Sequence, residues 1–481
     1  MPGKSYGIRE NSFFALLSHL IRLSANFVLF VGIARYCGPD ILGQFTTALT
    51  VATIFLLLAD FGFDILLSSE VARARDRAPA LLQAYLPAKL MFAVLASLLM
   101  AAAAGFDNVS PSTRTLVYIF CPYVFFGALM NFFLAFFKGS EQLHHETKIT
   151  FVANVLLLGA SLLVGIFHYD FLWIAVAFVV SRAIGLGLAA RTAFRICPDL
   201  RFRFVLPDRS SFPFIALFGL HAIFSSLFFI QDTLLLSLWK GDHDVGIYQS
   251  AFRLIGVILV IPDVAISAFL PVLSRSYEKD PGAWAKTAYF MNKTLLLIGL
   301  PIAVILFVYA EQIVGILYDS TVYSAAAPVL RVFSFVVLFH FAAISYAVML
   351  TSVLRQKSRL LIVAAATVVN FTLNLNLIPR FGPLGAAFAS AATILLVGIG
   401  YVWSMRATGP RWLGDTHQVL PVLGAILIAS ILWPIREFNL WLVGPLALVL
   451  LGAMVYLLGY TAEERRAMLR RRSLTLSSEL S

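Results

Sequence analysis

The sequence is short of charged residues. Only 13% of its 481 residues are Asp, Glu, Lys or Arg, whereas 60% are hydrophobic. A water-soluble globule of this size needs more polar side chains to cover its surface, so lipid must be the solvent for most of the chain. The formal net charge of +11 does not indicate nucleic acid, because the basic residues lie in short segments between long apolar runs and form no basic face of a soluble domain.

Cysteines and catalytic motifs are scarce as well. The three cysteines, Cys37, Cys121 and Cys197, are widely spaced, which gives neither a disulfide framework nor a CxxC metal or redox pair. The sequence lacks a phosphate-binding glycine loop, an HExxH zinc motif and a nucleophile elbow. His340 has no second ligand at metal-binding spacing. We therefore expect no soluble catalytic domain, no enzyme activity, no metal site and no cofactor.

Long apolar runs are what the sequence has in abundance. A helix needs about 20 mainly apolar residues to cross the hydrocarbon core, and the chain holds about fourteen such runs. The first run follows Lys4 and Arg9 but has no Ala-x-Ala cleavage site, so we expect a retained span and not a signal peptide. The predicted spans lie near Ser12–Tyr36, Gly43–Leu67, Ala80–Gly105, Thr115–Phe137, Ile149–Tyr169, Phe171–Ala190, Phe212–Trp239, Val245–Leu273, Thr294–Ala310, Val332–Leu354, Leu360–Ile378, Leu384–Met405, Val419–Ile435 and Leu440–Tyr460.

Lys and Arg alternate between successive loops. Every second loop and both terminal segments are rich in them, as in Arg73–Arg77 and Arg470–Arg472, whereas the intervening loops hold single basic residues such as Arg114. Because basic loops stay in the cytoplasm, we expect both termini there, in a multi-pass protein of the cytoplasmic (inner) membrane. No outer loop is long enough to fold on its own, the longest being about Glu311–Arg331.

The sequence contains an internal repeat. Gly38-x-x-x-x-Gly43-x-Phe45 is matched by Gly241-x-x-x-x-Gly246-x-Tyr248 at one constant offset, which also pairs two alanines and two aspartates further along. Both copies join an outward-running span to an inward-running one, so the halves are parallel copies, as in many transporters. We therefore expect an all-α polytopic membrane protein with two six-helix lobes and two C-terminal helices. The predicted parts are an N-lobe (1–195), a cytoplasmic linker (196–211), a C-lobe (212–408), two further spans (409–460) and a basic cytoplasmic tail (461–481).

Several cationic side chains lie inside the apolar runs. A charge at the centre of a membrane helix costs about 2.5–3.5 kcal/mol, so each should face a partner or a water-filled cavity. Arg22, with Asn26 one turn further along the same face, Arg182 and Arg253 are the examples. One interpretation is a lining for an anionic substrate, because the guanidinium fork binds phosphate oxygens in pairs and keeps its proton. The other is that Arg–Asp pairs neutralise one another and fix helix packing.

Other polar residues leave two interpretations open. Asp60 and Asp64, one turn apart toward the cytoplasmic end of the second span, are candidates to bind a coupling ion, proton or sodium alike, or to be structural. Lys89 lies near a cytoplasmic end, where we expect its ammonium group to snorkel to water. Asn370 and Asn374 share a helix face and either bond neighbouring helices or contact sugar.

Four segments together resemble a known family, the polysaccharide flippases of bacteria (O-antigen or exopolysaccharide type) within the multidrug/oligosaccharidyl-lipid/polysaccharide exporter (MOP) superfamily. They occur in the order and topology of that family, and the resemblance covers roughly residues 10–410. The segments are Gly38–Phe45 (GPDILGQF), Ala59–Phe63 (ADFGF), Asp244–Leu254 (DVGIYQSAFRL) and Asn370–Ala387 (NFTLNLNLIPRFGPLGAA).

The resemblance implies a flippase that moves isoprenoid-pyrophosphate-linked oligosaccharide units to the outer leaflet by alternating access, for surface polysaccharide assembly. It implies that Arg22 and Arg253 meet the pyrophosphate. The expected partners are a polyprenyl-pyrophosphate-linked glycan, the lipid bilayer and, as further candidates, a polysaccharide polymerase and chain-length machinery. The candidate substrate-binding residues are Arg22, Asn26, Arg182, Arg253, Asn370 and Asn374, and the candidate coupling-ion residues are Asp60 and Asp64.

Three rival functions are left open. A cation-coupled multidrug-type antiporter of the same superfamily would carry acidic residues in its N-lobe, as Asp60 and Asp64 allow, although Arg22 and Arg253 favour an anion. A peptidoglycan-precursor flippase would share the fold and the anionic head group. A membrane glycan polymerase or glycosyltransferase would need a large outer loop for its catalytic groups, and the sequence offers none.

Overall fold

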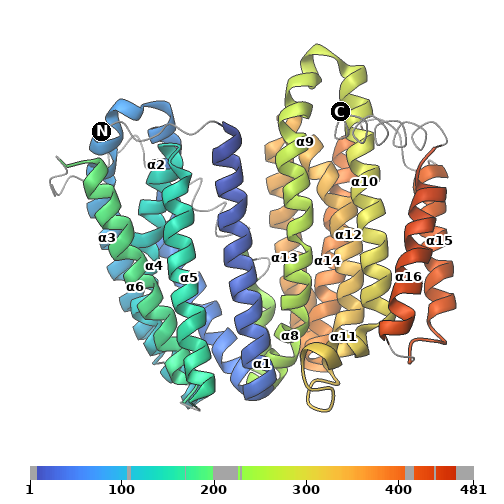
Figure 1. Cartoon of the computed structure of the whole chain (residues 1–481), viewed down its shortest axis with the longest axis horizontal. Coiled ribbons are helices and arrows are strands. Elements are labelled where there is room, and N and C mark those ends of the chain that lie inside the picture. The colour runs from blue at the N-terminus through green and yellow to red at the C-terminus, as the bar shows by residue number, and fades with distance from the viewer. Residues whose placement is uncertain are drawn as a thin grey trace, which may run out of the picture. The chain divides into compact units, whose positions relative to one another are not determined.

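A computed structural model describes residues 8–105, 110–167, 170–198, 226–227, 230–406, 416–437 and 440–461. All regular structure in these residues is helical (Figure 1). Within the described part of the chain, ten helical segments are long and apolar enough to cross a membrane, and two shorter apolar helices follow toward the C-terminal end. This confirms the predicted all-α multi-pass membrane fold. Most of the predicted linker, of the span Phe212–Trp239 and of the basic tail lies outside the described residues.

The chain forms two compact units. Unit 1 comprises Met1–Ser250 and Asn374–Pro383, and unit 2 comprises Ala251–Leu373 and Leu384–Ser481. The first residues of helix α8 (Asp242–Ile258) therefore belong to unit 1 and its remainder to unit 2.

Helix α1 (Ile8–Asp60) joins two predicted spans, Ser12–Tyr36 and Gly43–Leu67, without an intervening loop. The chain bends inside this helix at Gly38, whose φ of 83° and ψ of 176° are not helical, and Pro39 follows. Only glycine adopts this backbone conformation readily, because a Cβ would clash with the neighbouring peptide groups. The Gly-Pro pair thus turns the chain between two spans.

The second predicted span is broken toward its C-terminal end. Phe61 and Gly62 have φ values of 40° and 88°, so α1 stops at Asp60 and a separate helix, α2 (Phe63–Arg73), continues. The predicted span Gly43–Leu67 is therefore divided between two helices.

Helix α4 is the central helix of unit 1, since it packs against α1, α2, α3 and α6. On α4, Phe120 meets the rings of Phe45 on α1 and Phe178 on α6 edge to face, an arrangement favoured by the quadrupoles of aromatic rings. The rings of Phe45 and Phe178 also contact each other, so this aromatic group joins α1, α4 and α6. The remaining helices of the unit are α3 (Ala78–Ala103), α4 (Pro111–Gly139), α5 (Leu143–Ile166) and α6 (Leu172–Ile196).

Unit 2 is built around α10 and α12, which pack on each other and on α9. The two C-terminal helices, α15 and α16, attach to this group through an apolar cluster that includes Leu300, Val304, Ala447 and Leu451. The helices of unit 2 are α9 (Val260–Lys279), α10 (Pro281–Val308), α11 (Ala310–Leu317), α12 (Ala326–Ser352), α13 (Gln356–Phe381), α14 (Pro383–Met405), α15 (Thr416–Leu432) and α16 (Leu440–Met454). The end of α13, from Asn374 on, belongs to unit 1.

The two copies of the repeated glycine motif touch each other within unit 1. A Cβ atom added to Gly43 would meet the carbonyl carbon of Asp242 at 2.6 Å, and one added to Gly246 would meet the Cα of Pro39 at 2.8 Å. Pro39 and Asp242 occupy equivalent positions of the repeat. The contact is therefore reciprocal, as in an interface with two-fold symmetry.

The side chain of Asp242 ties this contact to the start of α4. Its carboxylate accepts hydrogen bonds from Ser110 Oγ at 2.6 Å and from Thr113 Oγ1 at 3.1 Å. Asp40, in the other copy, lies 3.4 Å from Nδ1 of His243, and both side chains are more than half exposed. The two aspartates thus stand in very different surroundings.

We expect Asp242→Ala to destabilise the protein by about 1.5–3 kcal/mol, the usual range for hydrogen bonds to a charged group. The change should appear as a lower thermal unfolding midpoint of the purified protein in detergent. Asp40→Ala removes only an exposed ion pair, worth about 0–1 kcal/mol, and serves as the matched control. Equal midpoints for the two variants would contradict the prediction.

Candidate functional site

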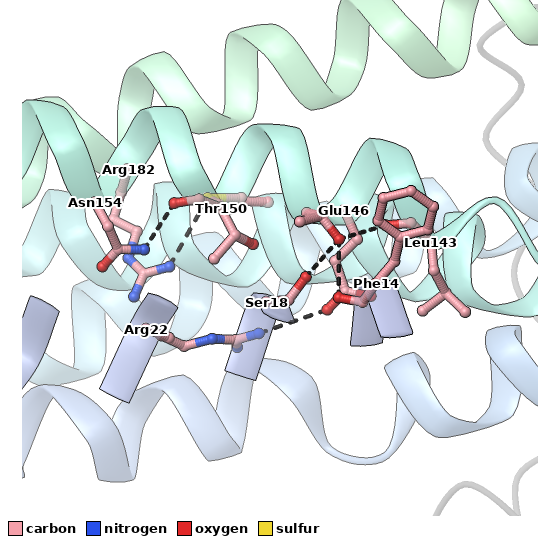
Figure 2. A network of polar contacts seen from close by, with 10 residues as sticks. Phe14, Ser18, Arg22, Leu143, Glu146, Thr150, Asn154 and Arg182 are labelled. Carbon is pink, nitrogen blue, oxygen red and sulfur yellow. Dashed lines mark hydrogen bonds and ion pairs between the residues drawn. The ribbon is translucent and has the colours of Figure 1, made fainter. Parts of the chain in front are cut away.

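Two of the predicted cationic residues lie close together in unit 1. Arg22 comes from α1 and Arg182 from α6, and their positive charges act on each other. Figure 2 shows both guanidinium groups alongside α5, where Glu146, Thr150 and Asn154 follow one another along the helix. Since these three residues are spaced four apart, they share one face of α5. We call these five residues the arginine cluster.

Arg22 is only partly engaged by its neighbours. Its Nη2 lies 3.5 Å from Oε1 of Glu146, and the two side chains are 41% and 15% exposed. Its Nε is buried and has no hydrogen-bond partner among the described residues. A buried donor without a partner costs about 1–3 kcal/mol, so Arg22 retains the capacity to bind a further acceptor.

Arg182 has neutral partners. Its Nη2 donates to the hydroxyl of Tyr123 at 3.4 Å, its Nη1 lies 3.8 Å from the sulfur of Met130, and its guanidinium group sits over the Tyr123 ring. No carboxylate among the described residues forms an ion pair with it. The arginine cluster therefore contains two guanidinium groups and one carboxylate, which leaves an excess of positive charge.

Neutral polar groups complete the cluster. Asn154 Nδ2 donates to the carbonyl oxygen of Thr150 at 2.7 Å, while Oγ1 of Thr150 is buried without a partner among the described residues. Asn26 lies one turn from Arg22 on α1 and is partly buried. The arrangement offers hydroxyl and amide groups beside the cations, as a polar, negatively charged head group would require.

The start of α5 is tied to α1 separately. Ser18 Oγ donates to Oγ1 of Thr147 at 2.8 Å, and Thr147 Oγ1 donates to the carbonyl oxygen of Phe14 at 2.9 Å. Ser18 and Thr147 are both buried. These bonds fix the register of α1 on α5 without involving the charged side chains (Figure 2).

The two predicted coupling-ion residues surround a lysine. Lys89 on α3 places Nζ 2.8 Å from Oδ1 of Asp60 and 2.8 Å from Oδ1 of Asp64, and its side chain is 0% exposed. The prediction that Lys89 snorkels to water was wrong, because these partners on α1 and α2 stabilise its charge inside the bundle. A coupling-ion role for the aspartates remains a prediction.

The other predicted substrate residues lie elsewhere. Arg253 belongs to unit 2, where it lies beside Tyr318. Asn370 donates to Thr393 Oγ1 at 3.2 Å in unit 2, and Asn374 donates to Oδ1 of Asp232 at 2.6 Å in unit 1. Both asparagines thus bond neighbouring helices, which is the structural alternative for them. A sugar contact remains a prediction.

Glu146, Thr150 and Asn154 were not predicted from the sequence. The signal that could have found them is a polar residue at every fourth position along an otherwise apolar run. Glu146 lies close to the beginning of the predicted span, where a carboxylate is tolerable, and Thr150 and Asn154 carry no charge. None of the three therefore stands out without the neighbouring helices.

Two family profiles match the chain. The family described as "Polysaccharide biosynthesis protein" matches residues 8–277, and the family described as "MatE" matches residues 218–375. No curated protein matches the chain significantly by sequence.

Solved structures share the fold over most of the chain. One is described as "Lipid II flippase MurJ, inward closed conformation" and is 13% identical to this chain. The matched region covers 92% of this chain and 98% of the MurJ chain, with a TM-score of 0.73. An inward-facing multidrug resistance MATE family transporter is 14% identical over 81% and 99% of the two chains, with a TM-score of 0.65. A MOP superfamily transporter from Pyrococcus furiosus is 14% identical over 82% and 95%, with a TM-score of 0.59. At these identities the likeness shows the fold alone.

Proposed function

Because the chain belongs to the polysaccharide biosynthesis protein family of the MOP superfamily, we propose that it is a flippase for isoprenoid-pyrophosphate-linked oligosaccharide units. Members of this superfamily are membrane transporters, and the chain is a transporter and not an enzyme. The substrate would pass from the cytoplasmic to the outer leaflet of the cytoplasmic membrane by alternating access, for surface polysaccharide assembly. The observation that carries the proposal is the excess positive charge of the arginine cluster.

The substrate poses a physical problem that such a cluster can solve. Each polar group that enters hydrocarbon without a hydrogen-bond partner costs several kcal/mol, and a pyrophosphate with its sugars carries many such groups. Guanidinium groups bind phosphate oxygens in pairs and stay charged in a low-dielectric environment. A site of this kind would hold the head group while the isoprenoid tail stays in lipid.

Arg22 and Arg182 would together receive the phosphate oxygens. An acceptor placed between them would give Nε of Arg22 the partner that it lacks and would reduce the repulsion between the two guanidinium groups. Thr150 and Asn154 would face the neighbouring polar groups of the substrate. Arg253, in unit 2, is proposed as a further cationic contact.

The remaining organisation is proposed from the sequence. We propose an N-lobe over residues 1–195, a C-lobe over 212–408 and two additional C-terminal helices over 409–460. Both termini are proposed to lie in the cytoplasm, because this orientation puts the basic loops there. A polysaccharide polymerase and chain-length machinery are proposed as further partners of the protein.

A second candidate function is a cation-coupled multidrug-type antiporter. It is favoured by the MatE match over residues 218–375 and by the acidic pair Asp60 and Asp64. Against it stands Lys89, whose ammonium group already occupies the space between these carboxylates. A cationic drug would also be repelled by the arginine cluster.

We expect Arg22→Ala or Arg182→Ala to reduce export of surface polysaccharide about 10- to 100-fold, because each removes charge-assisted hydrogen bonds worth about 1.5–3 kcal/mol. Lysine at either position should retain part of the activity, since its ammonium group keeps the charge but cannot bind two phosphate oxygens at once as a guanidinium group does. The measurement is surface polysaccharide in a flippase-deficient strain that expresses each variant, with the amount of protein in the membrane determined in parallel.

Arg75→Ala is the matched control, because Arg75 pairs with Glu141 at an exposed position outside the cluster. Normal export by the Arg22→Ala, Arg182→Ala double variant at normal protein levels would refute the assignment. If polysaccharide were normal but export of a peptidoglycan precursor were lost, that rival function would be supported instead.

A further inference from the structure

Glu146 is the carboxylate of the arginine cluster, and its Oε1 lies 3.5 Å from Nη2 of Arg22. We propose that Glu146 is a built-in competitor for the anionic head group. The ion pair between Glu146 and Arg22 forms in the absence of substrate and dissociates when the phosphate binds Arg22. It forms again as the phosphate is released. This inference rests on the proposed function, because it assumes an anionic substrate at Arg22 and Arg182.

The geometry of the Arg22–Glu146 ion pair would allow a ligand to replace Glu146. One nitrogen of Arg22 and one oxygen of Glu146 are 3.5 Å apart, whereas charge-assisted hydrogen bonds of this type are normally about 2.7–2.9 Å long and often paired. The Arg22 side chain remains 41% exposed. The contact is therefore loose, and a ligand that offers two oxygens could replace it without first breaking a strong bond.

Glu146 is not needed to hold the two helices together. Its neighbour Thr147 already links α5 to α1 through Ser18 and the carbonyl oxygen of Phe14. Ser18 and Thr147 are buried, and none of these bonds involves the side chain of Glu146. A carboxylate whose only role was structural would duplicate a connection that neutral groups already make.

The negative charge of Glu146 has opposite effects in the substrate-free and in the phosphate-bound site. In the empty site its carboxylate offsets part of the repulsion between Arg22 and Arg182, whose charges act on each other. Once a phosphate is bound, the same carboxylate is a like charge beside the ligand and repels it. Glu146 thus lowers the affinity for the head group and speeds its release, which a transporter needs in order to turn over.

This role predicts opposite effects on binding and on transport. Glu146→Gln keeps the size of the side chain and one acceptor oxygen, replaces the other oxygen by an NH2 donor, and removes the charge. Affinity for an anion should rise about tenfold, as expected for the loss of one nearby like charge at intermediate dielectric. Export should fall by a similar factor, because differences in affinity reside mainly in the rate of dissociation. A structural ion pair would instead lose affinity and stability on the same substitution.

The test uses the full-length protein purified in detergent, with inorganic pyrophosphate as the probe. Calorimetric titration compares wild type, Glu146→Gln and the double variant Arg22→Ala, Arg182→Ala, while polysaccharide export is measured in cells. Glu141→Gln is the matched control, since it makes the same change at an exposed residue beyond the cluster. Glu146→Asp keeps the charge and should bind pyrophosphate no more tightly than wild type.

Tighter, arginine-dependent binding by Glu146→Gln together with slower export supports the proposal. Equal or weaker binding by Glu146→Gln overturns it, as does tighter binding with unchanged export; in either case arginine-dependent binding by wild type would leave the proposed function standing. Lack of arginine-dependent binding in both wild type and Glu146→Gln would overturn the inference and the proposed anion site together.

Discussion

Replacing Lys89 with methionine is expected to leave little folded protein in the membrane. The substitution keeps the length of the side chain but removes the charge that lies 2.8 Å from both Asp60 and Asp64. Two carboxylates are then left inside the bundle without their counter-ion. Removing one member of a buried ion pair typically costs about 3–5 kcal/mol, a large part of the stability of most folded domains. The measurements are the level of the protein in the membrane and its thermal unfolding midpoint.

A rescue experiment separates charge from packing. Adding Asp60→Asn and Asp64→Asn to Lys89→Met replaces every charged member of the group, and such replacements are often close to neutral. We therefore expect the triple variant to recover most of the folded protein. Lys148→Met, at an exposed position on α5, is the matched control and should behave like wild type. A stable Lys89→Met protein, or a triple variant no better than the single one, would contradict this explanation.

The helical fold could be predicted from the sequence because lipid imposes it. In a bilayer every backbone polar group must find its partner within the segment, so a long apolar run has hardly any alternative to a helix. The connections were harder to predict. Gly38 and Pro39 were expected to separate two spans, and the non-helical backbone of Gly38 does divide the helical run there, but as a sharp kink without a connecting loop. Likewise, nothing in the apolar pattern indicates the break at Phe61 and Gly62.

The arginine cluster was predictable only where a charge interrupts an apolar run. Arg22 and Arg182 stand out on that ground, and the structure brings them together. The error on Lys89 has the same origin as the omission of Glu146. Distance to the end of a span can be counted in the sequence, whereas partners on other helices depend on how the helices pack and rotate. Hydropathy does not contain that information.

Adding a single methyl group at Gly43 or Gly246 is expected to disrupt the contact between the two repeats. In each alanine variant the new Cβ would fall within van der Waals overlap of backbone atoms, those of Asp242 for Gly43 and those of Pro39 for Gly246. Overpacking costs about 1–3 kcal/mol, and the upper end applies because backbone cannot rotate aside as a side chain can. Thermal unfolding and polysaccharide export are the measurements, and both should fall.

Gly43 and Gly246 make equivalent approaches to the opposite repeat in this reciprocal contact. Gly43→Ala and Gly246→Ala should have similar effects, because the two positions are equivalent. The double variant should cost less than the sum of the single variants, since one displacement of the two segments relieves both overlaps. Gly32→Ala and Gly256→Ala add the same methyl group where no atom lies within 4 Å and should be tolerated. If one repeat glycine accepted alanine while the other did not, the two motifs would not form a symmetric joint.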